Sequence, residues 1–305
     1  MSLKPPFDLK VEYLTGLPIV DHPRPRFSWK VTGSFRGDSP TAYQLILSSE
    51  SELCQREIGD LWDSGRVKTS FTSQIPYEGE ELLSCQKYYW RVRWWNSAGE
   101  ASPYSEVASL ATGFMGSTKF KANWITHPGP ECFTGPKTVL LGQEEPPDLQ
   151  SKAIYLRKEF SSPGPASRAT VYICGLGYYE LYINGQRVGD RVLDPAWSDY
   201  RQIAYYSVYE VTNLIQDKNV IGVILGNGRH IKKYGYDFPK LILKMEIYYA
   251  GGGYDLIASD NSWKAAAGPL QENGLYFGEN YDHRLEQPGW NLAGFDDENW
   301  KKWCR

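Results

Sequence analysis

Short runs of alternating apolar and polar residues, separated by glycine and proline, recur along this sequence, and stretches with the 3.6-residue period of an amphipathic helix are almost absent. In the run KYYWRVRWW, residues 87–95, successive side chains point to opposite faces of a strand. We expect Trp90 and Val92 in a core and the two arginines of this run in water. The 22 Tyr, 11 Trp and 11 Phe also favour strands. The sequence therefore predicts an all-β chain built of sandwiches.

The pattern divides the 305 residues into two sandwiches joined by a linker. Residues 1–115 hold about six or seven short strand patterns, the size of a fibronectin type III or immunoglobulin-like sandwich. Residues 116–150 are rich in proline, glycine and acids and show little periodicity, which predicts a linker. Residues 151–305 resume the strand patterns, and Asn184-Gly185 between two of them predicts a hairpin. We expect this second unit to be a jelly-roll, galactose-binding-like β-sandwich.

Charge and cysteine content exclude several classes of protein. With 33 Lys+Arg against 36 Asp+Glu, the formal net charge is −3, so a basic surface for nucleic acid or anionic lipid is not expected. No apolar run approaches the roughly 20 residues of a membrane helix, and the N-terminus lacks the apolar stretch of a signal peptide. Five widely spaced cysteines without a C-x-x-C pair indicate neither a disulfide framework nor a zinc site. A cytoplasmic location is favoured, whereas removal of a native N-terminal signal would place the protein in the periplasm or outside the cell.

No catalytic residue is predicted in this chain. The sequence lacks the fingerprints of nucleophile elbows, P-loops, zincins and dinucleotide-binding folds. Glycoside hydrolysis needs two carboxylates that face each other across a sugar. The acidic runs Asp296-Asp297-Glu298 and Glu144-Glu145 place neighbouring side chains on opposite faces or in water, so we interpret them as charged surface turns.

Two loops of the second unit combine the residue types of a sugar-binding site. Such sites pair flat aromatic faces, which cover the apolar face of a sugar ring, with polar side chains that bind its hydroxyls. Residues 189–201 and 226–239 offer this mixture. The candidate carbohydrate-binding residues are Asp190, Asp194, Trp197, Asp199, Tyr200, Asn227, Arg229 and Tyr236. The competing interpretation is that these residues form turns and pack against the sandwich, and the sequence alone leaves both open.

Four segments of the second unit, in their order and spacing, resemble a known domain. They are LGYYELYINGQRVGD, LDPAWSDYRQIAYYSVYEVTNLI, NVIGVILGNGR and GENYDHRLEQPGWNLAGFDDENW. Together they are similar to the non-catalytic β-sandwich that precedes the catalytic barrel in bacterial α-L-rhamnosidases of glycoside hydrolase family 78. In the first unit, RFSW, LWDSG, YYWRVRWWNSAG and SEVASLATGFMG resemble the fibronectin-like domain that opens many of these enzymes. The resemblance covers nearly the whole chain.

The resemblance implies that this chain is a non-catalytic N-terminal fragment of an α-L-rhamnosidase. In that family the acid and base carboxylates lie in an (α/α)6 barrel, the expected C-terminal partner domain, and Trp290 and Trp300 are expected at the junction with it. L-rhamnose-containing glycans or glycosides are the expected ligands. Some relatives bind L-rhamnose through calcium held by neighbouring Asp and Asn side chains. Here Arg191 follows Asp190, and a cation in place of an oxygen ligand puts a calcium site in doubt.

Two other function classes stay open at this point. One is a free-standing, lectin-like carbohydrate-binding protein made of two sandwiches. The other is a fibronectin-like protein-interaction module. The reading frame after Arg305 separates both from the rhamnosidase fragment, because we expect only the fragment to continue into a long helical pattern.

Overall fold

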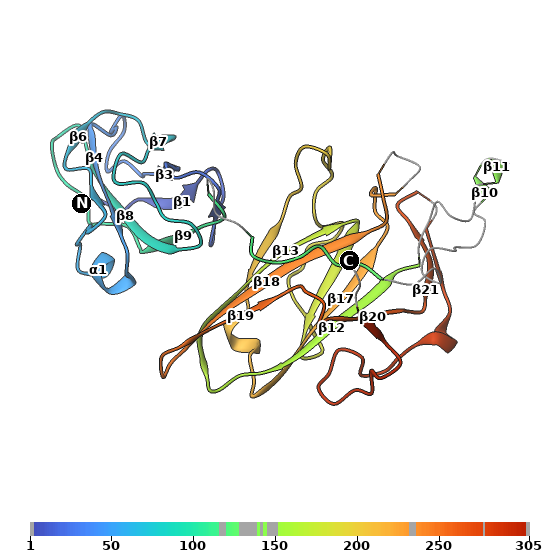
Figure 1. Cartoon of the computed structure of the whole chain (residues 1–305). Helices are drawn as coiled ribbons and strands as arrows, with labels where there is room; N and C mark the ends of the chain where they lie inside the picture. Colours follow the sequence, from blue (N-terminus) through green and yellow to red (C-terminus); the bar gives the residue numbers. More distant parts are fainter. Residues whose placement is uncertain are drawn as a thin grey trace. The chain divides into compact units, whose positions relative to one another are not determined.

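The computed structural model describes residues 3–115, 120–127, 139–140, 143–144, 152–231, 236–276 and 278–302, and the chain divides into two units, Met1–Phe120 and Lys121–Arg305 (Figure 1). Strands dominate the described part of both units, as predicted. Most of the predicted linker, residues 116–119, 128–138, 141–142 and 145–150, lies outside the described residues, and Glu145 with it. Between these gaps, β10 (Val139–Leu140) pairs with β11 (Gln143–Glu144). No helix among the described residues has the length and apolar composition to cross a bilayer.

Unit 1 is a sandwich of two sheets. The smaller sheet has the order β1 (Phe7–Val11), β3 (Arg26–Lys30) and β7 (Ile75–Pro76). The larger sheet has the order β2 (Ile19–Val20), β9 (Ala108–Thr112), β8 (Lys87–Trp95), β4 (Ala42–Ser48) and β5 (Trp62–Asp63), and β6 (Val67–Lys68) also pairs with β4. The short helix α1 (Ser51–Gln55) follows β4. This arrangement confirms the predicted immunoglobulin-like or fibronectin-like sandwich.

Strand β8 shows where alternation predicts burial and where it does not. Trp90 and Val92 lie in the core, as expected, and the Trp90 ring packs 4.7 Å from that of Phe27, centroid to centroid. The expectation that the arginines lie in water is only partly right, because Arg91 and Arg93 are half-buried. Their guanidinium carbons lie 5.7 and 4.8 Å from the ring centroid of Tyr104. Long charged side chains cover apolar surface in this way while their ends reach water.

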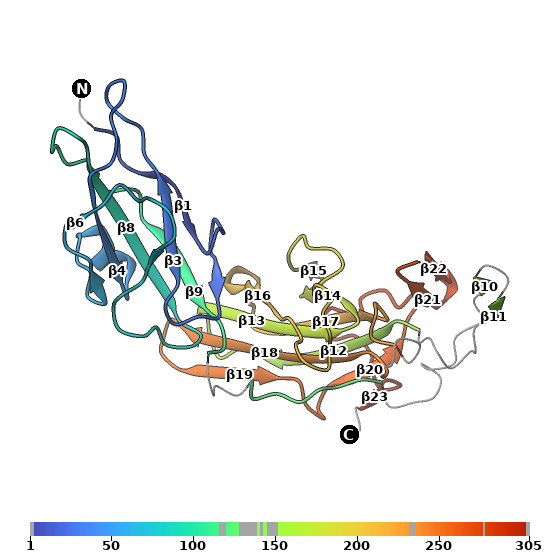
Figure 2. The same ribbon diagram turned by 90° about the horizontal axis from the view of Figure 1, so that it is seen from above.

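Unit 2 is a larger sandwich whose described strands all pair antiparallel. Its six-stranded sheet has the order β15 (Gln186–Arg187), β14 (Tyr178–Ile183), β17 (Lys218–Gly226), β12 (Ile154–Ser161), β20 (Lys264–Ala267) and β23 (Lys301–Lys302). Its four-stranded sheet has the order β16 (Ser207–Glu210), β13 (Ala166–Leu176), β18 (Lys240–Tyr249) and β19 (Tyr254–Ala258). The hairpin of β21 (Leu270–Gly274) and β22 (Gly278–Tyr281) lies at one end of the sandwich (Figure 2). Short 3-10 turns span Thr212–Leu214 and His283–Leu285.

The apolar core of unit 2 lies between the two sheets and draws on both. Leu156 and Val223 contribute from the six-stranded sheet, and Ile173 and Leu243 contribute from the four-stranded sheet. Ile125 joins the same core through a bridge to Leu241. The structure confirms the predicted jelly-roll-type sandwich.

Two glycine positions determine the local geometry at the two ends of β14. The predicted hairpin at Asn184-Gly185 is present, with φ of 51° and 80°, and it joins β14 to β15. Gly177, just before β14, has φ of +123°, and a Cβ built there would lie 2.1 Å from the carbonyl oxygen of Gly226. Only glycine fits such a position. Gly177 thus lets the chain that follows β17 approach the start of β14.

The C-terminal segment packs on the outer face of the six-stranded sheet. Trp290 and Trp300 are buried and stack with their ring centroids 6.3 Å apart, and the Trp290 ring lies 4.7 Å from Tyr155. Tyr155 is on β12 between two core residues, so its side chain points to the opposite face. The two tryptophans therefore cover a sheet face of their own unit, and their place at a junction with a further domain stays a prediction.

The structure corrects the expectation that Asp297 lies in a charged surface turn. Its carboxylate accepts a hydrogen bond from Arg157 of β12, whose side chain is 1% exposed, and another from Lys264 of β20 at 2.5 Å. Arg157 also donates to the carbonyl oxygen of Leu292 at 3.1 Å. Asp296 and Glu298 on either side are exposed. One carboxylate of the run therefore anchors the C-terminal segment to the sheet.

Candidate functional site

The two loops singled out in the sequence meet in the structure. The guanidinium carbon of Arg229 lies 4.3 Å from the ring centroid of Trp197 and 4.8 Å from that of Tyr276. The hydroxyl of Tyr236 donates a hydrogen bond to Asp199 Oδ1 at 3.2 Å. Trp197 and Tyr276 are 58% and 61% exposed, so much of both rings faces solvent. Exposed aromatic surface beside charged groups and hydroxyls is the arrangement that sugar binding requires.

Tyr276 is a residue that the sequence analysis missed. Tyr276 lies in the turn between β21 and β22. Its ring contacts Arg229, although the two residues are 47 positions apart in the sequence. The signal that could have found it is the string GLYFG, because apolar rings between two glycines are poorly placed to form a strand face. Its contact with Arg229 depends on the hairpin lying at this end of the sandwich.

Asp199 lies at the edge of this cluster and is ionised. The hydrogen bond from Arg201 at 3.2 Å holds the pKa of Asp199 below its ordinary value, so the group is ionised at neutral pH. Gln202 and Tyr236 also donate to it, at 3.1 and 3.2 Å. The Arg201 guanidinium lies 5.5 Å from the ring centroid of Tyr236. Asp199 therefore ties the two loops together and still faces solvent.

Tyr200 and His230 form the packed underside of the cluster. The Tyr236 ring lies 5.2 Å from Tyr200 and 5.4 Å from His230, centroid to centroid. Burial raises the pKa of Tyr200 to about 12 and lowers the pKa of His230, so both are neutral at pH 7. The Tyr200 hydroxyl is shielded from solvent. Tyr200, one of the predicted sugar-binding residues, thus packs against Tyr236 with its hydroxyl out of contact with solvent.

Asp194 is likewise a support and not a surface residue. It is 8% exposed, and its Oδ2 accepts hydrogen bonds from the hydroxyls of Tyr179 at 2.5 Å, Ser207 at 2.7 Å and Tyr209 at 2.9 Å. These donors come from β14 and β16. Burial is the main cause that raises the pKa of Tyr179, and the bond to Asp194 adds to it. The carboxylate fastens the 189–201 loop to both sheets.

Asn227 supports the second loop in the same manner. Its side chain is buried, and its Nδ2 donates to the carbonyl oxygen of Asn273 at 2.9 Å. Its backbone N–H donates to the Asn273 Oδ1 at 2.6 Å. These bonds join the end of β17 to β21 and thereby place Arg229 and Tyr276 on adjacent segments. Among the predicted site residues, Trp197, Asp199, Arg229 and Tyr236 form one cluster, in which the first two are exposed and the last two are half-buried.

The surroundings of Asp190 do not fit a calcium site. Asp190 is exposed, and the guanidinium of the next residue, Arg191, donates to Ser207 Oγ at 3.0 Å. Asp194 already accepts three hydroxyl donors. In the described part of the chain, no three His, Cys, Asp or Glu side chains gather as a metal site would need. Calcium favours six to eight oxygen ligands, several of them carboxylates.

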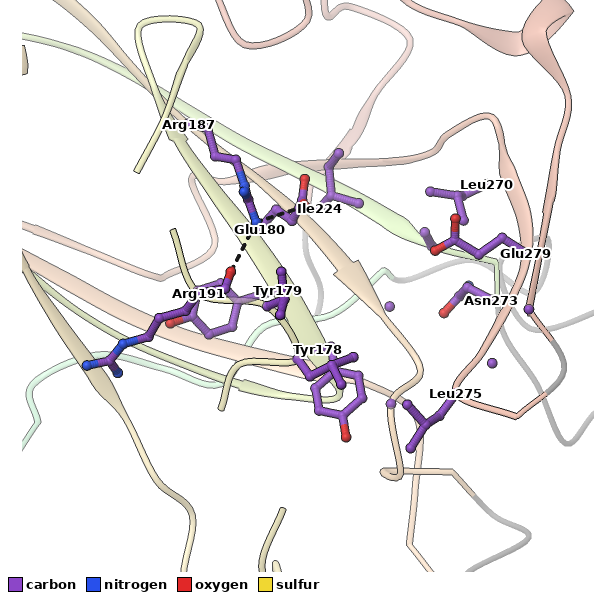
Figure 3. Close-up of a pocket in the computed structure, with 17 residues that line it drawn as sticks. Tyr178, Tyr179, Glu180, Arg187, Arg191, Ile224, Leu270, Asn273, Leu275 and Glu279 are labelled. Carbon is purple, nitrogen blue, oxygen red and sulfur yellow. Dashed lines mark hydrogen bonds and ion pairs between the residues drawn. The ribbon is translucent and has the colours of Figure 1, made fainter. Parts of the chain in front are cut away.

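A cavity of about 540 Å³ adjoins the cluster (Figure 3). Its walls come from β14, the end of β17, the 191–193 turn and the β21–β22 hairpin. Gly228 and Leu275 line it, and they are the chain neighbours of Arg229 and Tyr276. Figure 3 shows Glu180 and Arg187 directed toward each other, and they form an ion pair at 3.2 Å. The eight predicted residues do not line this cavity, which has the size of a small-ligand site.

The fold defines the chain as a modular all-β protein, an immunoglobulin-like sandwich followed by a galactose-binding-like jelly roll. Residues 6–116 match the profile of the family described as the Rha78A-like N-terminal immunoglobulin domain. Residues 164–304 match that of the α-L-rhamnosidase N-terminal domain. Each unit of the chain is therefore similar to a domain family of α-L-rhamnosidases.

Individual relatives agree with this assignment. An α-L-rhamnosidase of Formosa agariphila is 32% identical over 301 residues, which cover 92% of this chain and 31% of that protein. The solved α-L-rhamnosidase from Dictyoglumus thermophilum is 46% identical with a TM-score of 0.91, covering 99% of this chain and 34% of that one. The Streptomyces avermitilis α-L-rhamnosidase complexed with L-rhamnose has the same fold at 23% identity, with a TM-score of 0.89 and coverage of 98% of this chain and 44% of that one. The chain spans about a third of the length of the curated relatives it matches first.

Proposed function

We propose that this chain is the non-catalytic, β-sandwich part of an α-L-rhamnosidase and that its second unit binds a rhamnose-containing glycan. The enzyme would remove terminal α-L-rhamnose from glycosides or polysaccharides, with its acid and base carboxylates in a further (α/α)6 domain. Relatives with this activity in their names cover about nine tenths of the chain, which supports the first half of the proposal. The observation that carries the second half is the meeting of the two loops, where Arg229 lies on Trp197 and Tyr236 binds Asp199.

The purified chain is expected to release no rhamnose from an aryl α-L-rhamnoside. The reason is that Asp297, the most enclosed member of its acidic run, accepts hydrogen bonds from Arg157 and Lys264 and anchors the C-terminal segment, whereas a hydrolase needs two carboxylates on either side of a sugar. The measurement is the absorbance of the released aryl group. Turnover that persists through repeated purification and scales with this polypeptide would contradict the proposal.

Sugar binding at the loops is expected to be weak, near the millimolar end at about 4 kcal/mol, because the surface is open to water. Titration of ¹⁵N-labelled chain with L-rhamnose should move backbone NMR signals in residues 189–201 and 226–231 and leave residues 3–115 unchanged. Calcium and a chelator should give the same titration, because the residues around Asp190 do not fit that ion.

Trp197→Ala is expected to weaken L-rhamnose binding about tenfold, equivalent to ~1.4 kcal/mol, since it removes one aromatic face of the site. The readout is the same NMR titration. Phe71→Ala is the matched control, because Phe71 is an aromatic ring 72% exposed in unit 1, and its titration should equal that of the native chain. Equal binding by the native chain and Trp197→Ala, or shifts confined to unit 1, would show that the loops are not the sugar site.

A further inference from the structure

The outer face of the larger sheet of unit 1 gathers cations. Side chains alternate along β8, and those of Arg91 and Arg93 point away from the core of the sandwich. Lys68 of β6 lies on the same side of the sheet, because its partner on β4, Ala42, stands opposite Trp95 of β8. The core and this face therefore use opposite sides of the same strands.

Three arginines of this face alternate with two aromatic rings. The guanidinium carbons of Arg66 and Arg93 lie 4.7 and 5.1 Å from the ring centroid of Trp95. Those of Arg93 and Arg91 lie 4.8 and 5.7 Å from the ring centroid of Tyr104. A guanidinium held against an aromatic ring gains cation–π attraction and loses little freedom when it binds a ligand. The three arginines are thus held in a row.

The cations of this face have no acidic partner. Among the described residues, no ion pair includes Arg66, Lys68, Arg91 or Arg93. The other sheet of unit 1 differs, because Lys30 there pairs with Asp8 at 2.8 Å. Gln44 donates a hydrogen bond at 2.7 Å to Asp63 of the adjoining strand β5. The whole chain has a net charge of −3, so this face is a local concentration of positive charge.

Hydrogen-bond donors of these arginines remain for a ligand. Arg93 donates through Nε and Nη2 to Gln44 Oε1, at 3.0 and 2.6 Å. Arg91 donates through Nε and Nη1 to the carbonyl oxygens of Ser105 and Gln55, at 2.7 and 3.2 Å. In the described part of the chain, Arg93 Nη1, Arg91 Nη2 and the guanidinium of Arg66 have no hydrogen-bond partner. Like charges held in a row repel one another, and an anion bound to them removes that repulsion.

We propose that this face of unit 1 binds a sulfated polysaccharide. A row of positive charges complements a polymer whose negative charges repeat along its length. A sulfate ester is ionised at every pH at which proteins stay folded. It also has three terminal oxygens, so one sulfate can accept hydrogen bonds from two neighbouring guanidiniums. This contact lies on unit 1 and goes beyond the sugar site proposed for the loops of unit 2.

Nucleic acid also repeats negative charge, but the face lacks what its recognition needs. Single strands bind through exposed rings on which bases stack. Trp95 and Tyr104 are each 8% exposed and lie against arginines, so they offer little surface to a base. Duplex grooves admit a helix or a two-stranded ribbon, whereas this face belongs to a broad sheet. The observations therefore favour the polysaccharide.

The test compares short-chain dextran sulfate with unmodified dextran of the same length, by NMR titration of the native chain. Dextran sulfate is expected to move signals of residues 66–68 and 87–95, and to bind about tenfold more tightly than dextran or better. Its affinity should fall about tenfold between roughly 0.05 and 0.3 M salt, because the contacts are ionic. The two polymers share a backbone and differ in charge, so this comparison needs no protein variant.

Variants locate the contact. Arg66 and Lys68 are exposed, so their replacement leaves the core of unit 1 intact. Arg66→Gln should weaken binding of dextran sulfate about fivefold, and the double variant Arg66→Gln with Lys68→Gln about twentyfold. Arg24→Gln is the matched control, because Arg24 is an exposed arginine of unit 1 that has an acidic partner, Glu81 at 3.9 Å. It should keep the native affinity within about twofold.

Three results would overturn the proposal. The first is equal binding of dextran sulfate and dextran, and the second is native affinity in the double variant. The third is tighter binding of polygalacturonate or of single-stranded DNA than of dextran sulfate, which would assign the face to another class of polymer. The L-rhamnose titration reports on the loops of unit 2, so its failure would leave this proposal standing, and failure here would leave the sugar site standing.

Discussion

Replacement of Asp297 by alanine is expected to destabilise unit 2 by about 3 kcal/mol, because it leaves the buried guanidinium of Arg157 without its main counter-charge. Arg157 is 1% exposed, and its remaining partners are Glu159 at 3.2 Å and the carbonyl oxygen of Leu292 at 3.1 Å. Lys264 would lose its carboxylate partner and keep its hydrogen bond to the backbone carbonyl oxygen of residue 297, at 3.1 Å. The measurement is the urea concentration at the midpoint of unfolding, followed by NMR signals of unit 2. These signals report unit 2 alone, so separate unfolding of unit 1 does not change the result.

The same pair predicts a pH dependence. Burial raises the pKa of the Asp297 carboxyl, but the hydrogen bond from Lys264 and the charge of Arg157 outweigh it and hold that pKa below its ordinary value. A carboxyl whose folded pKa is lowered contributes stability above its unfolded pKa of about 3.9 and loses it as pH falls through the folded pKa. The difference in stability between the native chain and Asp297→Ala should therefore narrow below about pH 4.

Glu298→Ala is the matched control, because Glu298 is the exposed neighbour of Asp297 in the same acidic run. Its effect should stay within about 0.5 kcal/mol. The double variant Arg157→Met with Asp297→Leu should be more stable than Asp297→Ala, since no buried charge is left unpaired. A midpoint for Asp297→Ala equal to that of Glu298→Ala would show that this pair does not anchor the C-terminal segment.

Replacement of Asp194 by alanine is the second change with a large expected effect, a loss of about 3 kcal/mol from unit 2, since three hydroxyls lose a charged acceptor. The loop 189–201 should lose its attachment to β14 and β16, so L-rhamnose should no longer move signals in that loop. Asp194→Asn should lose less, because an amide oxygen still accepts two of the three hydroxyls. Urea midpoints and the NMR titration measure the two effects.

An exposed aspartate of unit 2 provides the control. Asp217→Ala should keep both the stability and the sugar response of the native chain, because Asp217 lies at the surface away from the loops. If Asp194→Ala keeps the urea midpoint of the native chain and the NMR shifts with L-rhamnose, Asp194 does not hold the 189–201 loop in place.

Local sequence patterns predicted much of the fold of this protein. Alternation in residues 87–95 predicted the burial of Trp90 and Val92, and the Asn-Gly pair predicted its hairpin, because both depend on neighbours within one strand or one turn. The same patterns predicted two β-sandwiches in order along the chain. The two candidate sugar-binding loops were proposed from composition, since aromatic residues and acids occur there without the period of a strand.

Tertiary structure alone decided which side chains of those loops are exposed to solvent. Asp194 and Trp197 are three positions apart, yet Asp194 is buried among hydroxyls from β14 and β16, whereas Trp197 is exposed beside Arg229. Tyr276 reaches this cluster from a different hairpin. Asp297 and Glu298 are adjacent in the sequence, and only Asp297 meets Arg157. A polar side chain is buried only where residues from other strands supply hydrogen-bond donors or opposite charges. A local sequence pattern does not contain those residues, so it cannot predict this burial.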